Sequence, residues 1–231
     1  MAVLELKKRG LSIGEGQPLV AIAGLNVLEG LDLALDAAQR LREIAERLAM
    51  PFVFKASFDK ANRSSMQSFR GPGLDKGLEI LARVKAEFDV PICTDVHTEA
   101  QVGPVSEVAD VVQIPAFLCR QTDLVVAVAR AVAASGGWLH VKKGQFLAPW
   151  DCKAILDKIA EAAPQTSTIL CERGVSFGYN NLVVDMLGIP EMKALGVPVT
   201  IDATHAVQLP GADKRSNSIA TGGRREGVPV I

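Results

Sequence analysis

Short apolar runs alternate along the chain with longer stretches in which apolar residues recur every three or four positions. The run at 52–54 is typical of a buried strand, whereas Leu74, Leu78, Leu81 and Val84 lie on one face of an amphipathic helix. The two patterns follow one another in regular succession. This order predicts a parallel sheet whose strands are joined by covering helices.

An N-terminal hairpin over residues 3–17 is expected to close the bottom of this sheet. The pattern then predicts strands over 18–25, 52–56, 91–96, 111–115, 138–143, 168–173 and 197–203, and helices over 31–48, 74–88, 98–108, 122–134, 151–162 and 182–195. Strand–helix units with little sequence between them favour a closed TIM (β/α)8 barrel over a doubly wound sheet. The length suits one barrel domain over residues 1–231.

A closed barrel needs eight strands, and the pattern supplies seven. The run Gly222-Gly223-Arg224-Arg225 would precede a seventh helix, and only six residues follow it. We therefore expect the last strand and the last helix of the barrel to be absent from the given sequence.

Composition excludes several kinds of partner. The net charge of -1 gives no general attraction to nucleic acid or to an anionic membrane. The four cysteines lie far apart without zinc-ligand spacing, which fits reduced thiols. The N-terminal residues are charged where a secretion signal is apolar, and no apolar run reaches membrane-spanning length. These features predict a cytoplasmic protein with neither nucleic-acid nor membrane partners.

Every predicted strand ends in a polar residue. In a parallel barrel the reactive face lies at the carboxyl ends of the strands. The residues there are, in chain order, Asn26, Lys55, Asp95 with His97, Gln113, Lys142 with Lys143, Arg173, and Asp202 with His205. Seven such endings in register predict a functional site. Because strand side chains alternate, only one of Lys142 and Lys143 should face this site, and we favour Lys142.

A dense group of cations and hydroxyls follows the strand at 52–56. Three cations and three hydroxyls lie within eleven residues: Lys55, Lys60, Arg63, Ser57, Ser64 and Ser65. Such a segment can surround a phosphate, although charged loops after strands are also common without any ligand. Together with the cations that follow later strands, up to six positive side chains lie near one cleft at the carboxyl ends of the strands. This cleft suits polyanionic ligands.

Several long motifs resemble one enzyme family. The runs at 54–65, 69–73, 94–97, 113–123, 141–146, 172–174, 177–185 and 202–205 resemble 3-deoxy-D-manno-octulosonate 8-phosphate synthase. The first run contains Lys-Ala-Asn-Arg-Ser-Ser, which the related synthases that use erythrose 4-phosphate do not share. The resemblance extends from residue 20 to about residue 226 and is highly specific.

The resemblance implies a transferase of lipopolysaccharide biosynthesis. Carbon 3 of phosphoenolpyruvate attacks the aldehyde of D-arabinose 5-phosphate, water adds at carbon 2, and inorganic phosphate leaves by C–O cleavage. The family is also expected to form a homotetramer whose ligands are small molecules.

The same resemblance implies roles for individual residues. Phosphoenolpyruvate is expected to bind Ser57, Lys60, Gln113, Lys142, Arg173 and the backbone of Ala116. Arabinose 5-phosphate is expected to bind Asn62, Arg63 and Ser64. The implied catalytic residues are Asn26, Lys55, Asp95 and His205. Lys55 would lie near the reacting carbonyl, Asp95 would bind sugar hydroxyls, and His205 would position the attacking water.

The residue after the first barrel strand bears on metal dependence. Relatives with cysteine there require a metal, and relatives with asparagine are metal-free. Asn26 therefore favours a chain with no metal or other cofactor. The segments at 119–120, 143–144, 148–151 and 208–211 are closer to the metal-requiring type, so the subtype stays open. The resemblance also places two acidic metal-site positions and the last strand after Ile231.

Two other functions stay open at this point. One is a sister phosphoenolpyruvate-condensing synthase that uses another aldose, which a panel of aldoses in a phosphate-release assay would separate. The other is a phosphosugar-binding barrel without catalysis, which ligand binding without turnover would support.

Overall fold

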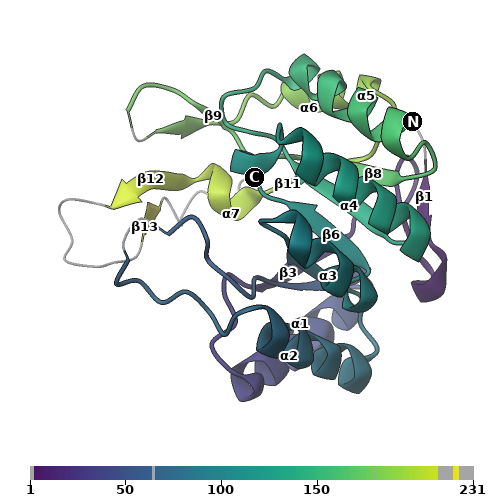
Figure 1. The fold of residues 1–231 in the computed structure, drawn as a ribbon, viewed down its shortest axis with the longest axis vertical. Coiled ribbons are helices and arrows are strands. Elements are labelled where there is room, and N and C mark those ends of the chain that lie inside the picture. Colours follow the sequence, from purple (N-terminus) through teal and green to yellow (C-terminus); the bar gives the residue numbers. More distant parts are fainter. Residues whose placement is uncertain (1–2, 64–65, 180, 213–220, 224–231) are drawn as a thin grey trace.

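The computed structural model describes residues 3–63, 66–179, 181–212 and 221–223. Its centre is one parallel sheet of seven strands in the order β11-β8-β7-β6-β5-β4-β3 (Figure 1). The strands are β3 (Ala21–Leu25), β4 (Phe52–Ala56), β5 (Ile92–Asp95), β6 (Val111–Ile114), β7 (Trp138–Lys142), β8 (Ser167–Glu172) and β11 (Val199–Ile201). These strands pair in chain order, as in a barrel wall, whereas a doubly wound sheet reverses direction. The predicted TIM-barrel-like fold is confirmed.

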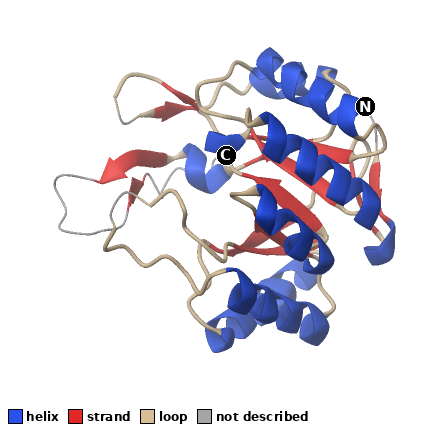
Figure 2. Ribbon diagram, viewed as in Figure 1, coloured by secondary structure: helices blue, strands red, loops and turns tan. Residues whose placement is uncertain are grey.

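Helices cover the outer face of the sheet (Figure 2). They are α1 (Leu31–Arg47), α2 (Leu74–Phe88), α3 (Val102–Val108), α4 (Thr122–Ser135), α5 (Cys152–Ala162) and α6 (Gly188–Ala194). The short α7 (Ala203–Ala206) instead lies at the carboxyl end of the strands, beside β12 (Gln208–Ala212) (Figure 1). Outward-facing strand residues such as Phe54, Val112 and Leu139 form one core with the apolar faces of the covering helices. No helix within the described residues is both long and apolar enough to cross a membrane.

The predicted helix over 182–195 is partly wrong. Leu182–Val183 forms β10, which pairs antiparallel with β9 (Val175–Ser176), and α6 begins only at Gly188. The carboxylate of Asp185 accepts a hydrogen bond from the amide of Leu187 at 2.9 Å, which favours a turn before the helix. The apolar run at 182–184 therefore continues a hairpin, because a run this short does not distinguish strand from helix.

Two further boundaries differ near the C-terminus. The strand predicted over 197–203 spans only Val199–Ile201, because Asp202 caps the following turn by accepting from the amide of His205 at 3.0 Å. Gly222 and Gly223 belong to β13 (Thr221–Gly223), which pairs with β12 (Gln208–Ala212). The helix predicted after them lies outside the described residues.

The N-terminal hairpin closes one end of the barrel, as predicted. Strands β1 (Leu4–Leu6) and β2 (Leu11–Ile13) pair antiparallel, and their apolar side chains pack against inward-facing residues of the sheet. Those residues are Val53, Cys93, Val111, Trp138 and Ile169. In Figure 1 the hairpin lies on one side of the sheet, and β9, β12 and β13 project on the opposite side.

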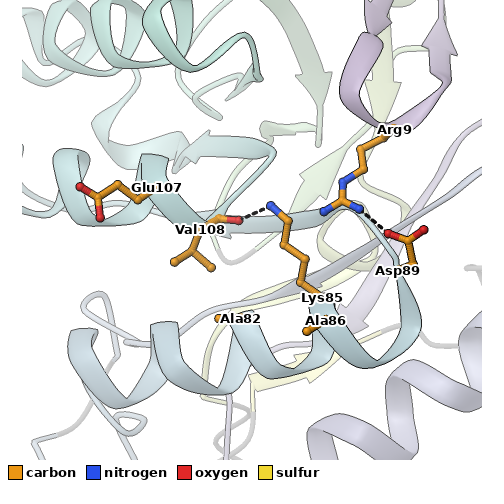
Figure 3. A pocket seen from close by; sticks show the side chains of 7 residues that line it. All are labelled: Arg9, Ala82, Lys85, Ala86, Asp89, Glu107 and Val108. Atoms are coloured by element: carbon orange, nitrogen blue, oxygen red, sulfur yellow. Dashed lines mark hydrogen bonds and ion pairs between the residues drawn. The ribbon is translucent and has the colours of Figure 1, made fainter.

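Ion pairs fasten this hairpin to the outside of the barrel. Arg9 donates to Asp89 at 2.6 Å and to Asp110 at 3.2 Å. Lys85 lies beside them and contacts Asp110 at 2.9 Å and the carbonyl of Val108 at 2.7 Å. These residues line a hollow of about 410 Å³. In Figure 3, Arg9 is directed toward Asp89 and Lys85 toward Val108. The cations of this hollow already have protein partners, so it is a fastening point of the fold.

Candidate active site

Consecutive strands carry polar side chains toward the end of the barrel opposite the hairpin. Asp95 of β5 lies in register with Gln113 of β6, and Gln113 with His140 of β7. The alternation of strand side chains puts Lys142 on the same inner face as His140, one step nearer the carboxyl end. The sheet therefore gathers residues distant in sequence into one site.

The hydroxyl of Ser57 connects two lysines to a carboxylate. Lys55 Nζ and Lys60 Nζ donate to Ser57 Oγ at 2.8 and 3.2 Å, and Ser57 Oγ donates to Asp95 Oδ1 at 2.5 Å. A serine hydroxyl offers one proton and two lone pairs, so all its bonding capacity is used. Each ammonium group retains further protons for a ligand. The sequence placed these residues at the site, but it did not predict that Ser57 would bridge them.

Burial and neighbouring charges change the pKa values in this cluster. Burial, reinforced by the charge of Lys55, lowers the pKa of Lys60 to about 8. Burial opposes the ionisation of Asp95, but the charge of Lys55 and a 3.1 Å bond from His97 outweigh it and hold its pKa well below the usual range. The cluster thus keeps a permanent carboxylate beside a lysine that an anion would stabilise in its charged form.

A second cluster joins β7 to the end of β11. Lys142 and His205 both contact the carboxylate of Asp202, His205 through Nδ1 at 2.7 Å. Burial disfavours both charges, but the attraction between Lys142 and Asp202 raises the pKa of Lys142, and His205 and Lys142 lower that of Asp202. Because an ionised carboxylate only accepts, Nδ1 of His205 carries the proton. Its Nε2 then holds a lone pair.

His205 is also biased toward its neutral form. The bond to Asp202 raises its pKa, but burial together with the charges of Lys142 and Arg173 prevails and lowers the pKa below the ordinary value. A neutral imidazole with a free Nε2 lone pair can accept a proton from water. His205 therefore has the electronic state of a general base.

Arg173 comes from the turn after β8. Its Nη1 donates to Gln145 Oε1 at 3.0 Å, and burial lowers its pKa. The backbone amides of Arg173 and Gly174 donate to Glu172 Oε1 at 2.8 and 2.6 Å. Gly174 has φ +90°, a conformation that a glycine adopts without strain. Glu172 thus fixes the turn that presents the guanidinium.

Lys143 has a different position from its neighbour Lys142. The prediction that only one of them faces the site is confirmed, since Lys142 faces it and Lys143 is fully buried on the other face. Lys143 Nζ lies 3.3 Å from Glu172 Oε1 and donates to the carbonyl of Leu147 at 3.2 Å. Lys143 therefore does not add to the cations of the site and the upper limit of six is not reached: its contacts hold together two of the loops that shape the site.

The loop after β4 is fixed at its base. Asp59 is buried and accepts two bonds from Arg70, at 2.6 and 2.9 Å, while the amide of Lys60 donates to the carbonyl of Arg70 at 2.7 Å. Gly71, with φ +113°, passes so close to Phe58 that a Cβ would lie 2.4 Å from its carbonyl oxygen. These contacts hold the segment that carries Lys60.

The remaining predicted site residues that the structure describes belong to neither of the two hydrogen-bonded clusters. Asn26 and Asn62 are exposed, and neither side chain makes a hydrogen bond to another described residue. Arg63 is half-buried, and its buried Nε has no partner within the described part of the chain. Ala116 is buried at the start of a short 3-10 helix (Ala116–Leu118). Ser64 lies outside the described residues.

Sequence reasoning missed His140. This imidazole is buried between Gln113, at 3.3 Å from Nδ1, and Thr200, at 2.9 Å from Nε2. Burial, aided by the charge of Lys142, lowers its pKa to about 3. The available signal was its spacing: a residue two positions before Lys142 in a strand shares its face.

A parallel barrel-type sheet with clustered lysines and an arginine at its carboxyl edge defines an α/β barrel-type protein with a positively charged candidate site. Residues 2–228 match the model of the DAHP synthetase I family. The chain belongs to this family.

Curated relatives match nearly the whole chain. A protein of Desulfosudis oleivorans is 54% identical over 222 residues, covering 96% of this chain and 76% of the relative. One of Marinobacter nauticus is 54% identical over 228 residues, covering 99% and 78%. One of Paracidovorax citrulli is 53% identical over 231 residues, covering 98% and 78%. Each is named 2-dehydro-3-deoxyphosphooctonate aldolase.

Proposed function

We propose that this chain condenses phosphoenolpyruvate with D-arabinose 5-phosphate and water to give 3-deoxy-D-manno-octulosonate 8-phosphate and inorganic phosphate. The observation that carries the proposal is the pair of lysines joined through Ser57 to Asp95, on the same inner face as Lys142, Asp202 and His205. One cluster suits anionic substrates and the other holds a base. The names of the relatives support the same reaction, since that aldolase makes this product.

Phosphoenolpyruvate is the proposed ligand of the innermost cations. Its carboxylate and phosphate would bind Lys60, Lys142 and Arg173, with Gln113 and the amide of Ala116 as neutral partners. Ser57, which the resemblance also assigns to this substrate, would hold Lys60 in place, because its hydroxyl is occupied by Lys55, Lys60 and Asp95. The lowered pKa of Lys60 supports this assignment, because a bound anion returns to the ammonium the stabilisation that burial removes. Hydrogen bonds between ionised groups are also the stronger kind.

Arabinose 5-phosphate is the proposed ligand of the outer loop. The Nε of Arg63, which has no partner among the described residues, supports a phosphate there, since a guanidinium binds phosphate through two parallel bonds. Asn62 and Ser64 would complete this site. Asp95 would bind the sugar hydroxyls, and Lys55 would lie at the aldehyde oxygen.

The proposed reaction uses these groups in order. Carbon 3 of phosphoenolpyruvate bonds to the aldehyde carbon as the C=O π bond breaks, and Lys55 donates a proton to the oxygen that takes up the electron pair. Water bonds to carbon 2 while Nε2 of His205 takes its proton. The C–O bond then breaks with its electron pair passing to phosphate, and the hydroxyl at carbon 2 gives its proton to the departing phosphate, which leaves a ketone and inorganic phosphate. The proton held by His205 returns to Lys55 through solvent. Holding both substrates in register contributes roughly 7–11 kcal/mol to lowering the barrier.

Phosphate release measured with phosphoenolpyruvate and a panel of aldose phosphates tests the function. We expect turnover with arabinose 5-phosphate and little with erythrose 4-phosphate. A preference for another aldose would identify a sister synthase. Calorimetric binding of both substrates without phosphate release would identify a phosphosugar-binding barrel.

Metal dependence rests on Asn26, and we propose that turnover needs no transition metal. An amide is a weaker ligand than a thiolate. Phosphate release before and after exhaustive chelation should be the same. Activity that disappears with the metal and returns with it would show that the segments resembling the metal-requiring type report the subtype.

A homotetramer in the cytoplasm is the form we propose for the protein. Four buried, free thiols support a reducing compartment, and burial raises the pKa values of Cys93 and Cys152 to about 12. Analytical ultracentrifugation tests the oligomeric state. A monomer that remains fully active would contradict the tetramer.

A further inference from the structure

His140 lies between two residues that can each exchange the roles of donor and acceptor. Its Nδ1 faces Gln113 Oε1 at 3.3 Å, and its Nε2 faces Thr200 Oγ1 at 2.9 Å. All three residues lie on the inner face of the sheet, on the neighbouring strands β6 and β7 and on β11. The imidazole is buried and stays neutral, because burial and Lys142 lower its pKa to about 3. One ring nitrogen therefore donates and the other accepts.

The first arrangement begins with Thr200 as a donor. Its hydroxyl donates to Nε2, and Nδ1–H of His140 donates to Gln113 Oε1. The amide oxygen of Gln113 is then occupied by the ring. Its NH2 group remains free to donate to another partner, which suits an anion.

The second arrangement reverses the chain of bonds. The Thr200 hydroxyl also lies 3.3 Å from the carbonyl of Leu170 and could donate its one proton there. His140 would then donate from Nε2, and its unprotonated Nδ1 would face Gln113 Oε1, so that two acceptors oppose each other. Turning the Gln113 amide over would relieve the conflict but would leave its oxygen, which repels anions, as the free group.

We infer that His140 is a positioning residue that, as the Nδ1–H tautomer, directs the Gln113 amide NH2 toward phosphoenolpyruvate. This inference rests on the proposed function, in which Gln113 binds that substrate. The atom that faces Nδ1 in the structure is the amide oxygen of Gln113, which only accepts, and this orientation requires the same Nδ1–H tautomer. His140 does not touch the substrate and acts only through Gln113.

Nitrogen NMR of histidine-labelled protein tests the tautomer directly, without substrate. The chain has three histidines, and His97→Gln and His205→Gln variants assign the spectrum. We expect His140 to show a protonated Nδ1 and an unprotonated Nε2 at neutral pH. A protonated Nε2 would overturn the inference even if phosphoenolpyruvate binding depended on Gln113.

Kinetics of three variants test the coupling to the substrate. His140→Phe removes the donor, and we expect KM for phosphoenolpyruvate to rise about tenfold, the usual effect of one hydrogen bond, with KM for arabinose 5-phosphate unchanged. His140→Asn restores an N–H near the position of Nδ1 and should rescue most of the loss. Ile169→Val is the matched control: Ile169 is the register partner of His140 on β8, and its apolar side chain cannot form a hydrogen bond to Gln113.

Gln113→Leu separates this inference from the proposed function. If it raises KM for phosphoenolpyruvate while His140→Phe does not, the positioning role fails and the substrate assignment stands. If Gln113→Leu has no effect, the ligand role of Gln113 and the inference both fail. Equal loss in His140→Phe and His140→Asn, with a normal thermal stability, would also overturn the positioning role.

Discussion

The two ends of the barrel interior use the same strands and the same faces, yet one is apolar and the other charged. Ile169 of β8 packs against the N-terminal hairpin, and Arg173 follows four residues later in the turn after the strand. On β4 the corresponding pair is Val53 and Lys55. A period of two fixes the face, so the position along the strand decides whether a residue serves stability or chemistry.

At the charged end, buried positive and negative side chains stabilise one another. Ser57, Asp95 and Asp202 neutralise or bridge the lysines that surround them. A buried charge without such a partner is strongly unfavourable, whereas the apolar end needs only close packing. Substitutions at the charged end should therefore lower substrate affinity, and substitutions at the apolar end should lower the free energy of unfolding.

The largest contrast is expected on β8. Arg173→Ala should leave the fold intact and lower the affinity for phosphoenolpyruvate by at least about a hundredfold, because charge-assisted bonds are lost. Ile169→Ala, at the apolar end, should lower the free energy of unfolding by about 2–5 kcal/mol and leave that affinity unchanged in the folded protein. Calorimetric titration and denaturant unfolding measure the two. Unchanged affinity in folded Arg173→Ala would move the phosphate site elsewhere.

A second contrast separates the two substrates. Arg63→Ala should weaken the binding of arabinose 5-phosphate by roughly 2–4 kcal/mol, since the variant removes a charge-assisted phosphate contact. The binding of phosphoenolpyruvate should be almost unaffected. Both Michaelis constants should be measured. Arg83→Ala, which removes an exposed pair with Glu87 on α2, is the control. Equal effects on both substrates would contradict the assignment of Arg63.

The pH dependence reports the charge of Lys60. Its pKa of about 8 means that the free enzyme holds the ammonium below that pH and loses it above. The kcat/KM for phosphoenolpyruvate should fall about fivefold between pH 8 and pH 9, because the neutral amine no longer attracts the anion. Lys60→Arg keeps the charge and should flatten this part of the profile. A flat profile in the unsubstituted protein would assign the anion to other groups.

The smallest effect is expected at the base of the outer loop. Arg70→Ala leaves Asp59 buried without its partner and should raise both Michaelis constants about two- to fivefold through a less ordered loop, with kcat little changed. Arg40→Ala, which removes an exposed pair with Asp36 on α1, is the matched control. A loss confined to kcat would show that this pair does more than hold the loop.

Local patterns in the sequence determined most of the framework. Alternating apolar periods predicted the seven strands, their helices and the closing hairpin, and the polar strand ends predicted the face of the site. The long motifs predicted the family to which the chain belongs. The assigned substrate roles, including those of Asn26, Asn62 and Ser64, remain predictions. The apolar run at 182–184 misled, because a few residues are compatible with strand and helix alike.

The tertiary structure decided the partners and the charge states. Lys142 meets Asp202 from sixty residues away, Lys143 meets Glu172 behind the sheet, and His140 becomes a neutral link between Gln113 and Thr200. Periodicity fixes only the face on which a side chain lies. Folding brings together strands that are distant in sequence. These strands decide which group lies opposite a side chain and how far burial shifts its pKa.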